Sequence, residues 1–415
     1  MISDISTSEM LRAKSATGGG AQATFFVVCV CALITLLEGF DIQAIGIAAP
    51  SLMPLLKLTP SQGGMIFGGG MGGFVIGSLL GGWLSDRIEQ KLVLLFAVIG
   101  FGLSTLLTAP ATDYLWLLAA RFITGLGLGA AIPIIIAVAH RVCPERWRTF
   151  TVSATLAGMP LGGAIVAGYA ATFMPVLGWK SLFYIGGIIP LALVPLIALL
   201  PKREPQVELS TPKLKPRVNW RDALFPEGQV LTTLSLWIGF CATLTVLYIF
   251  LNWLPSLVTG MGLTAQVGAL CSLSFNLASI AGTLAIGMAI DRLGFRWCAP
   301  LCYAGILFGV FALANAHSEN ALLAASGAIG FFLLGAPYGL YAVVPSFYPR
   351  AHRGFGTGTA IGMARIGSIL GPILGGFIMN LPHGTTHVVE YLVPLVVAGG
   401  LAALTLAIRA RTFED

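Results

Sequence analysis

The chain contains twelve apolar stretches, each long enough to cross a lipid bilayer as a helix. The hydrocarbon core of a bilayer takes about 20 residues of helix. Inside that core every backbone N–H and C=O must find a partner within the protein. A bundle of helices is therefore the expected fold. The stretches are 23–49, 62–84, 92–110, 114–139, 149–173, 181–201, 230–258, 265–289, 298–316, 320–345, 357–380 and 388–409.

The composition supports this fold class and excludes others. Apolar residues make up 56% of the 415 residues and charged residues only 10%, whereas a soluble chain carries about 25% charge. The 52 glycines are typical of membrane helices whose backbones pack closely. A soluble enzyme, a nucleic-acid-binding protein and a disordered chain are excluded, and the lipid bilayer is the expected surrounding.

The positions of lysine and arginine predict which side of the membrane the loops face. Nineteen of the 23 basic residues fall in the two tails, the central loop and the loops that follow even-numbered stretches. The opposite loops hold two, Lys57 and Lys180. Because basic residues are enriched in cytoplasmic loops, both termini are expected in the cytoplasm. The formal charge of +6 then reflects topology rather than an anionic partner.

One long linker, rich in proline and charge, divides the stretches into six and six. Two motifs also recur in equivalent loops at an offset of 205 residues, which predicts two pseudo-symmetric bundles with a substrate site between them near the membrane midplane. The predicted domains are a cytoplasmic tail (1–22), a six-helix bundle (23–201), a central cytoplasmic loop (202–229), a second six-helix bundle (230–409) and a cytoplasmic tail (410–415). The repeated motifs are Gly82-x₃-Asp86-Arg87 with Gly287-x₃-Asp291-Arg292, and Pro144-x₃-Arg148 with Pro349-x₃-Arg353.

Four ionisable residues lie well inside the apolar stretches: Glu38, Asp41, Arg121 and Arg365. Each costs about 2.5–3.5 kcal/mol in hydrocarbon, so each is a candidate functional residue. Glu38 and Asp41 share one helix face at i, i+3, and two nearby carboxylates in a low dielectric cannot both ionise easily. The pair is predicted to carry a coupling proton, with Asp41 as the first candidate and Glu38 as the second. The alternative is a static ion pair that only holds helices together.

The depths of these residues predict their partners. At 1.5 Å per residue, Asp41 and Arg121 both lie about 10–12 Å from the same membrane face, so Arg121 is expected to pair with the acidic face. Arg365 belongs to the second bundle and has no acid at its depth there. A substrate carboxylate is the predicted counter-charge, because the planar guanidinium binds carboxylates in a bidentate manner. Two acids and two arginines sum to zero, so protonating one acid leaves a site of charge +1 that favours a monovalent anion.

Several motifs resemble the major facilitator superfamily, and within it the aromatic acid:proton symporters of the hydroxyphenylpropionate and hydroxybenzoate type. The loop 82–91 resembles the signature between helices 2 and 3 of the superfamily, with Glu89 and Gln90 in place of the usual Gly and Arg. The segment 37–48 resembles the acid-Gly-Phe-Asp segment of the symporters. The other similar motifs are Arg121-Phe122-x₂-Gly125-x-Gly127-x-Gly129, Asn252-Trp253-Leu254-Pro255 and Gly362-x₂-Arg365-x-Gly367.

This resemblance implies an all-α membrane protein with the major facilitator fold, twelve transmembrane helices in two pseudo-symmetric six-helix bundles. It further implies a monomeric symporter that imports small aromatic carboxylates with protons by alternating access and needs no cofactor. The expected location is the cytoplasmic (inner) membrane of a bacterium, in the service of aromatic hydrocarbon catabolism. The alternative is a proton-coupled antiporter of the same fold that exports drugs or organic metabolites.

The resemblance also selects candidate residues around the cavity, which helices 1, 4, 7 and 10 line in this fold. For the aromatic and amide residues among them, the alternative role is packing between helices. The loop residues are candidates for a latch that gates transport, and their alternative role is to anchor the topology. Besides Arg121 and Arg365, the candidates for substrate binding are Tyr248, Asn252, Tyr338, Tyr341, Phe275 and Asn276. The loop candidates are Gly82, Asp86, Arg87, Lys91, Asp291, Arg292, Arg148 and Arg353.

The sequence does not predict an enzyme. The apolar stretches contain no Ser–His pair, no His/Asp cluster and no set of metal ligands, and the chain has no G-x₄-G-K-[ST] loop for a nucleotide. The seven cysteines lie in or beside apolar runs and are expected to be free thiols. A secondary transporter is therefore the predicted class.

Overall fold

The computed structural model describes residues 7–143, 151, 154–200, 224, 230–348, 352–381 and 388–409. All regular structure in this part of the chain is helical, and twelve of its helices are long and apolar enough to cross a membrane. The predicted all-α membrane fold is therefore confirmed. Most of the predicted central loop and the C-terminal tail lie outside the described residues, and the first helix begins inside the predicted N-terminal tail.

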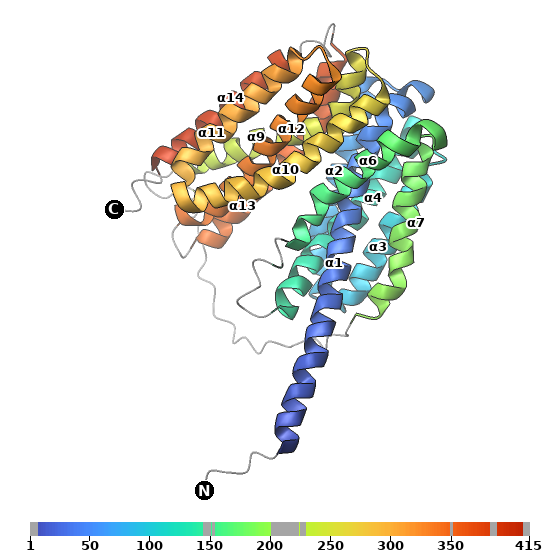
Figure 1. Cartoon of the computed structure of the whole chain (residues 1–415), viewed down its shortest axis with the longest axis vertical. Helices are drawn as coiled ribbons and strands as arrows, with labels where there is room; N and C mark the ends of the chain where they lie inside the picture. The colour runs from blue at the N-terminus through green and yellow to red at the C-terminus, as the bar shows by residue number, and fades with distance from the viewer. Residues whose placement is uncertain are drawn as a thin grey trace.

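The helices form two groups that lie side by side (Figure 1). The first group comprises α1 (Thr7–Leu55), α2 (Pro60–Ser85), α3 (Gln90–Thr108), α4 (Tyr114–Val142), α6 (Gly158–Leu177) and α7 (Lys180–Ala198). The second comprises α9 (Val230–Gly260), α10 (Ala265–Leu293), α11 (Phe295–Ala314), α12 (Glu319–Val343) with the short 3₁₀ helix η2 (Val344–Phe347), α13 (Arg353–Met379) and α14 (Val388–Arg409).

The helix starts repeat at the offset of 205 residues found in the loops. Thr59 and Thr264 cap α2 and α10, and Asp113 and Ser318 cap α4 and α12. Each cap side chain accepts a hydrogen bond from the backbone N–H three residues later, at 2.9–3.3 Å. A cap of this kind satisfies one of the N–H groups that a helix N-terminus leaves unpaired. The same local chemistry therefore starts equivalent helices in both groups.

Close helix packing repeats at this offset too. Gly125 of α4 lies against the backbone of Gly70 in α2, and Gly330 of α12 lies against the backbone of Phe275 in α10. A Cβ atom at either glycine would overlap that backbone, so each position needs glycine for the helices to approach. The two groups are thus built on one packing plan.

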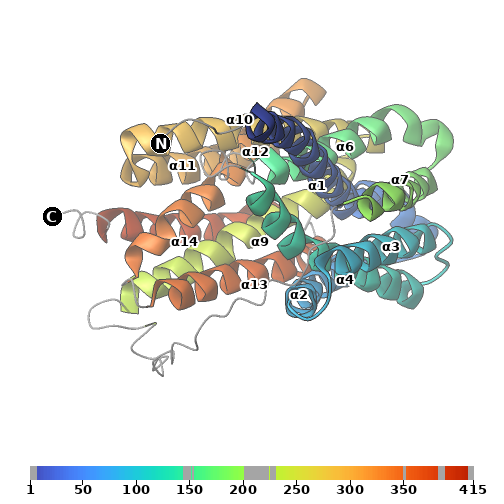
Figure 2. The ribbon, with the colours of Figure 1, turned by 90° about the horizontal axis from the view of Figure 1, so that it is seen from below.

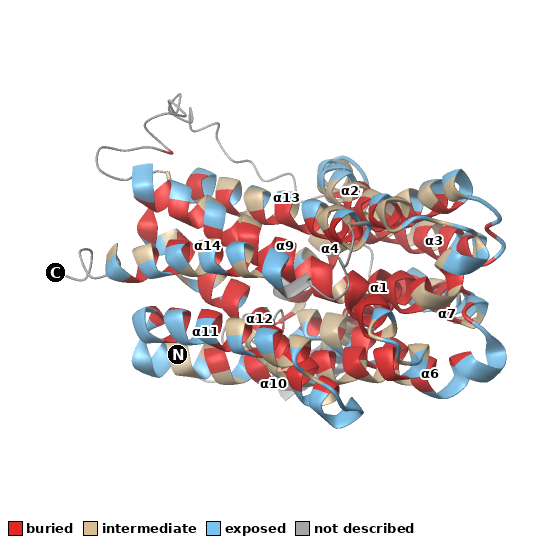
Figure 3. Cartoon of the chain, turned by 90° about the horizontal axis from the view of Figure 1, so that it is seen from above, coloured by how far each residue is buried: buried red, intermediate tan, exposed pale blue. Residues whose placement is uncertain are grey.

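Burial follows the pattern expected of a protein surrounded by lipid. Buried residues face the interior of the two groups and exposed residues face outward (Figure 3). Many outward side chains are large and apolar, for example Leu79, Phe96 and Phe308. A soluble protein rarely exposes apolar surface on this scale, so the outward faces suit contact with hydrocarbon.

The two groups contact each other at the end that carries the α1–α2 and α9–α10 connections, which we call the sealed end (Figure 1). Near the start of α2, Gly64 lies against Pro372 near the end of α13. Near the start of α10, the Gln266 side chain donates a 3.0 Å hydrogen bond to the Ala171 carbonyl of α6. Figure 2 shows the two groups from below the view of Figure 1, where the start of α1 projects toward the viewer.

Candidate functional site

Asp41 and Arg121 form a buried ion pair between α1 and α4. The guanidinium meets the carboxylate with two hydrogen bonds, Nη2 to Oδ2 at 2.6 Å and Nη1 to Oδ1 at 3.1 Å. Asp41 is 0% exposed and Arg121 4% exposed. The hydroxyl of Thr105 in α3 donates a further bond to Oδ1 at 2.8 Å. The pairing expected from equal depth is thus present, in the bidentate form that Arg makes and Lys cannot.

Glu38 lies one helical turn before Asp41 and is bonded quite differently. Its side chain is 2% exposed, and its Oε2 atom has no hydrogen-bond partner among the described residues. Arg365 is close enough to interact with Glu38 electrostatically. A buried carboxylate oxygen without a donor is costly when the group is ionised.

Arg365 enters the site from α13 in the second group. It forms no ion pair with any residue that the structure describes. Its guanidinium carbon lies 5.1 Å from the ring centroid of Phe74 in α2, a cation–π contact between the two groups. Arg365 is also close enough to interact electrostatically with Tyr248 of α9 and Tyr341 of α12. Arg365 is therefore a half-buried cation that forms no ion pair in the described chain and whose nearest acid is Glu38.

The charged residues do not follow the internal repeat. At the offset of 205 residues, Thr243 stands opposite Glu38, Val246 opposite Asp41 and Ser326 opposite Arg121. Packing and helix caps are shared between the two groups, whereas Glu38, Asp41 and Arg121 belong to the first group alone and Arg365 to the second alone. A feature that breaks the repeat at the cost of burying charge points to function rather than to architecture.

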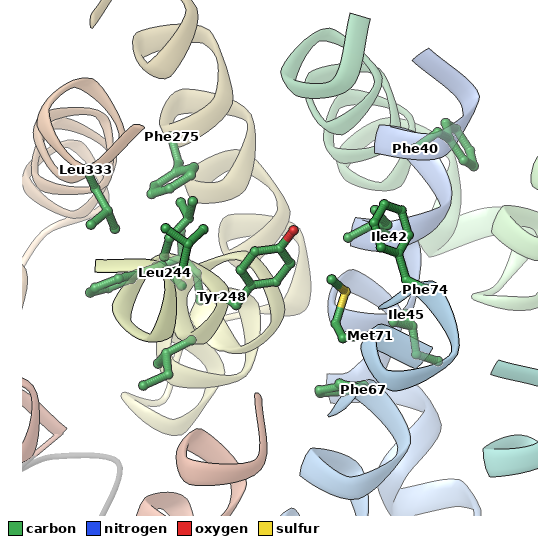
Figure 4. Packing of buried hydrophobic residues seen from close by; sticks show 14 of the residues in the cluster. Phe40, Ile42, Ile45, Phe67, Met71, Phe74, Leu244, Tyr248, Phe275 and Leu333 are labelled. Carbon is green, nitrogen blue, oxygen red and sulfur yellow. The ribbon is translucent and has the colours of Figure 1, made fainter. Parts of the chain in front are cut away.

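A small cavity adjoins this cluster, between α1, α2, α4 and α9. Figure 4 shows its apolar side chains on the first group and Tyr248 of α9 directed toward them. A few polar groups among apolar walls are typical of a site for a small organic ligand. The cavity is lined by Ile42, Ile45, Phe67, Gly70, Met71, Phe74, Arg121, Gly125, Leu128 and Asn252.

The other candidates for substrate binding lie in different surroundings. Phe275 stacks on Phe250 inside the second group, with ring centroids 6.5 Å apart. Tyr338 and Tyr341 meet edge to face at 6.5 Å. Of these three candidates, Tyr341 lies within the electrostatic reach of Arg365, whereas the contacts of Phe275 are those of packing.

Asn276 contacts the opposite group instead of the cavity. Its Nδ2 donates to Oε1 of Gln43 in α1 at 2.8 Å, and Nε2 of Gln43 donates to its Oδ1 at 2.9 Å. This reciprocal amide pair joins α1 to α10. Gln43 lies inside the segment 37–48 that resembles the symporters. Nothing in the sequence indicates that two uncharged amides 233 residues apart would pair.

The amide pair fits because α6 carries Gly163 beside it. A Cβ atom there would overlap the Gln43 amide. We therefore expect Gly163→Ala to break the pair and loosen the sealed end, raising hydrogen exchange in the neighbouring turns of α6 and α10 about tenfold, the effect of losing roughly 1.4 kcal/mol. Gly168→Ala is the matched control, because its Cβ would meet only Leu273, at 3.9 Å. Equal exchange in both variants would contradict a role for the pair in closure.

The predicted gating residues lie away from the sealed end and make local contacts. The Arg87 guanidinium rests on the Trp83 ring at 3.8 Å, and Lys91 Nζ donates to the Leu200 carbonyl at 3.0 Å. Asp86 is the exposed C-cap residue of α2. No ion pair joins these side chains to the second group within the described chain. Their role as a gating latch therefore stays a prediction, and it concerns a conformation other than this one.

The remaining loop candidates are likewise at helix ends. Asp291 and Arg292 are exposed in the last turn of α10, and Arg353 is the exposed first residue of α13. Gly82 has open space where a Cβ would stand. Arg148 lies outside the described residues.

The described residues form twelve helices that are long and apolar enough to cross a membrane, in two repeated groups with buried charges and a cavity between them, which is the architecture of a multi-pass membrane protein. The sequence model of the Major Facilitator Superfamily matches residues 31–275 and 264–414. The chain belongs to this superfamily, as its motifs indicate, and it is a transporter rather than an enzyme.

Relatives of known activity cover most of the chain. The 3-(3-hydroxy-phenyl)propionate transporter of Escherichia coli K12 is 37% identical over 92% of this chain and 93% of its own length. A 4-hydroxybenzoate transporter of Pseudomonas aeruginosa is 32% identical, covering 88% and 89%. The gallate transporter of Pseudomonas putida is 31% identical, covering 88% and 87%. The chain is thus similar to aromatic acid transporters along nearly its whole length.

Solved structures agree on the fold. A D-xylose-proton symporter superposes with a TM-score of 0.75 at 18% identity, over 92% of this chain and 97% of the other. A nucleoside transporter superposes with a TM-score of 0.73 at 14% identity, over 95% and 100%. At such low identity the likeness concerns architecture and not substrate.

Proposed function

We propose that this protein imports small aromatic monocarboxylates together with protons. The observation that carries the proposal is Arg365, a cation between the two helix groups that forms no ion pair in the described chain. Relatives that transport a hydroxyphenylpropionate, a hydroxybenzoate and gallate support an aromatic acid as the substrate class. The apolar side chains that line the cavity beside Phe74 suit contact with an aromatic ring.

The charges of the site supply a coupling scheme. Asp41 and Arg121 neutralise each other within the ion pair, which leaves Glu38 and Arg365. When Glu38 holds a proton, the site carries one net positive charge and accepts one carboxylate. When Glu38 ionises, its negative charge competes with the substrate for Arg365 and weakens binding. Proton and anion therefore bind together, which is the requirement for symport.

The packing supports alternating access. The positions of the basic residues support a cytoplasmic location for both termini, and with that orientation the sealed end faces the opposite, outer side. For the outer side to open, the helix groups must separate there and break the Gln43–Asn276 pair. A substrate held by both groups would bias this two-state equilibrium. We propose that the transporting unit is a monomer in the inner membrane of a bacterium, coupled to protons and to no other cofactor, and that it serves aromatic hydrocarbon catabolism.

The proposal is tested by uptake of labelled 4-hydroxybenzoate or 3-(3-hydroxyphenyl)propionate into vesicles that contain the purified protein. An inward proton gradient should concentrate the acid inside, and collapse of the gradient by a protonophore should release it. Accumulation under the opposite gradient would instead indicate the antiport alternative. Absence of any transport of either acid under both gradients would overturn the substrate class.

Arg365 yields a specific prediction. Arg365→Ala should weaken binding of the aromatic acid by about 100-fold, because a buried charge-assisted bond contributes about 3 kcal/mol. Binding of the methyl ester, which has no charge for the guanidinium, should change little. The measurement is competition by acid and ester against a labelled substrate on purified protein. An equal loss for both would show that Arg365 supports packing or gating and does not contact the carboxylate.

A further inference from the structure

The cavity beside the ion pair has one polar end and otherwise apolar walls. Ile42, Ile45, Phe67, Met71 and Phe74 supply the apolar side chains (Figure 4). The second helix group supplies Asn252, which is 3% exposed. Of the lining residues, Arg121 is engaged by Asp41. Asn252 is therefore the polar side chain of the cavity with bonding capacity to spare.

The orientation of the Asn252 amide is set by its own helix. Its Nδ2 donates a 2.9 Å hydrogen bond to the carbonyl of Tyr248, one turn earlier. The reverse orientation would place two acceptor oxygens against each other, so the nitrogen must face that carbonyl. Among the described residues, Oδ1 then has no donor. An amide oxygen that accepts no hydrogen bond in the wall of a cavity favours a ligand that brings an O–H group.

The backbone around Asn252 is held firmly. Gly46 of α1 packs so closely that a Cβ atom there would lie within 3.0 Å of three Asn252 backbone atoms. The adjacent Trp253 donates from its ring nitrogen to the Pro372 carbonyl at 2.8 Å. An acceptor on such a rigid support can discriminate between ligands, because it cannot move to find another partner.

The spacing along α2 relates Asn252 to the carboxylate position. Phe67 contacts Trp253, next to Asn252, with ring centroids 5.0 Å apart. Phe74, seven residues further, holds the Arg365 guanidinium. Seven residues of helix span about 10 Å. The separation of Phe67 and Phe74 along α2 thus suits the length of an aromatic ring with its carboxylate at one end and a hydroxyl group at the other.

From this geometry we infer that Asn252 determines specificity by accepting a hydrogen bond from a hydroxyl group on the substrate ring, on the side away from the carboxylate. The inference rests on the proposed function and narrows it to ring-hydroxylated acids. Arg365 holds the carboxylate, the apolar walls hold the ring, and Asn252 distinguishes a hydroxyl from a hydrogen or a methoxy group, neither of which can donate.

The test compares three ligands on purified full-length protein: 4-hydroxybenzoate, benzoate and 4-methoxybenzoate. The wild type should bind the hydroxylated acid about tenfold more tightly than the other two, the ratio expected from one buried hydrogen bond. Asn252→Leu should abolish this preference, and Asn252→Ala removes the same acceptor without requiring a branched side chain to fit. Phe67→Leu, a change in the apolar wall, should weaken all three ligands alike and preserve their ratio.

Equal affinity of the wild type for the three acids would overturn the inference while leaving the aromatic acid proposal intact. Retention of the tenfold preference by folded Asn252→Leu or Asn252→Ala would also overturn it. Failure of the wild type to bind any of the three would count against the proposed function itself.

Discussion

Asp41→Asn should abolish accumulation of substrate against a gradient and should also lower the stability of the protein by about 3–5 kcal/mol. The variant keeps the shape of the side chain but leaves Arg121 buried without a counter-charge. Loss of one partner of a buried ion pair is far more costly than loss of both. The measurements are gradient-driven uptake in vesicles and thermal unfolding in a fixed detergent. Uphill transport by a stable Asp41→Asn protein would contradict the prediction that accumulation requires the Asp41 carboxylate.

Two further variants separate charge from geometry at this pair. The double variant Asp41→Asn/Arg121→Gln removes both charges, so it should recover most of the stability but none of the accumulation. Arg121→Lys keeps the charge but cannot form the two parallel bonds to the carboxylate, so it should also fail to transport. Full transport by the lysine variant would reduce Arg121 to a static counter-ion.

Glu38→Gln should also abolish coupling but, unlike Asp41→Asn, with little loss of stability. Its Oε2 has no donor among the described residues, so a neutral amide costs no ion pair there. If Glu38 holds the coupling proton, the wild type should lose uptake as external pH rises, because the proton leaves the acid and the carboxylate competes for Arg365. Glu38→Gln should exchange substrate at a rate that no longer depends on pH, and its accumulation should fall to the equilibrium ratio.

The matched control is Glu319→Gln, which neutralises an exposed acid in the first turn of α12. It should leave the pH profile of uptake unchanged. If Glu38→Gln keeps the pH profile of the wild type and Asp41→Asn becomes independent of pH, the proton is held on Asp41, which is the first candidate from the sequence. The two acids are thus distinguished by pH dependence and by stability measured on the same proteins.

Features that depend on a single helix, or on how deep a residue lies in the membrane, could be predicted from the sequence. Apolar length predicts the twelve spans, and equal depth predicts the contact between Asp41 and Arg121 that the structure describes. The repeat offset also appears in the helix caps, because a cap is a local signal.

Contacts between the two helix groups could not be predicted in the same way. The Gln43–Asn276 pair and the Phe74–Arg365 contact depend on how the groups dock, and neither residue type demands a particular partner. Asn276, predicted near the substrate, contacts Gln43 for this reason. Thr105 could not be selected either, because a hydroxyl in a membrane helix usually bonds to its own backbone.

The position of the ion pair along the chain also has a consequence for how the protein is made. Arg121 follows Asp41 by 80 residues. At about 5–20 residues per second, ribosomes deliver α4 roughly 4–16 s after α1. During that interval Asp41 reaches the bilayer without its cation, at a cost of about 3 kcal/mol. We therefore expect α1 to stay beside the insertion machinery until α4 arrives, so that assembly of the first helix group is timed by the synthesis of Arg121.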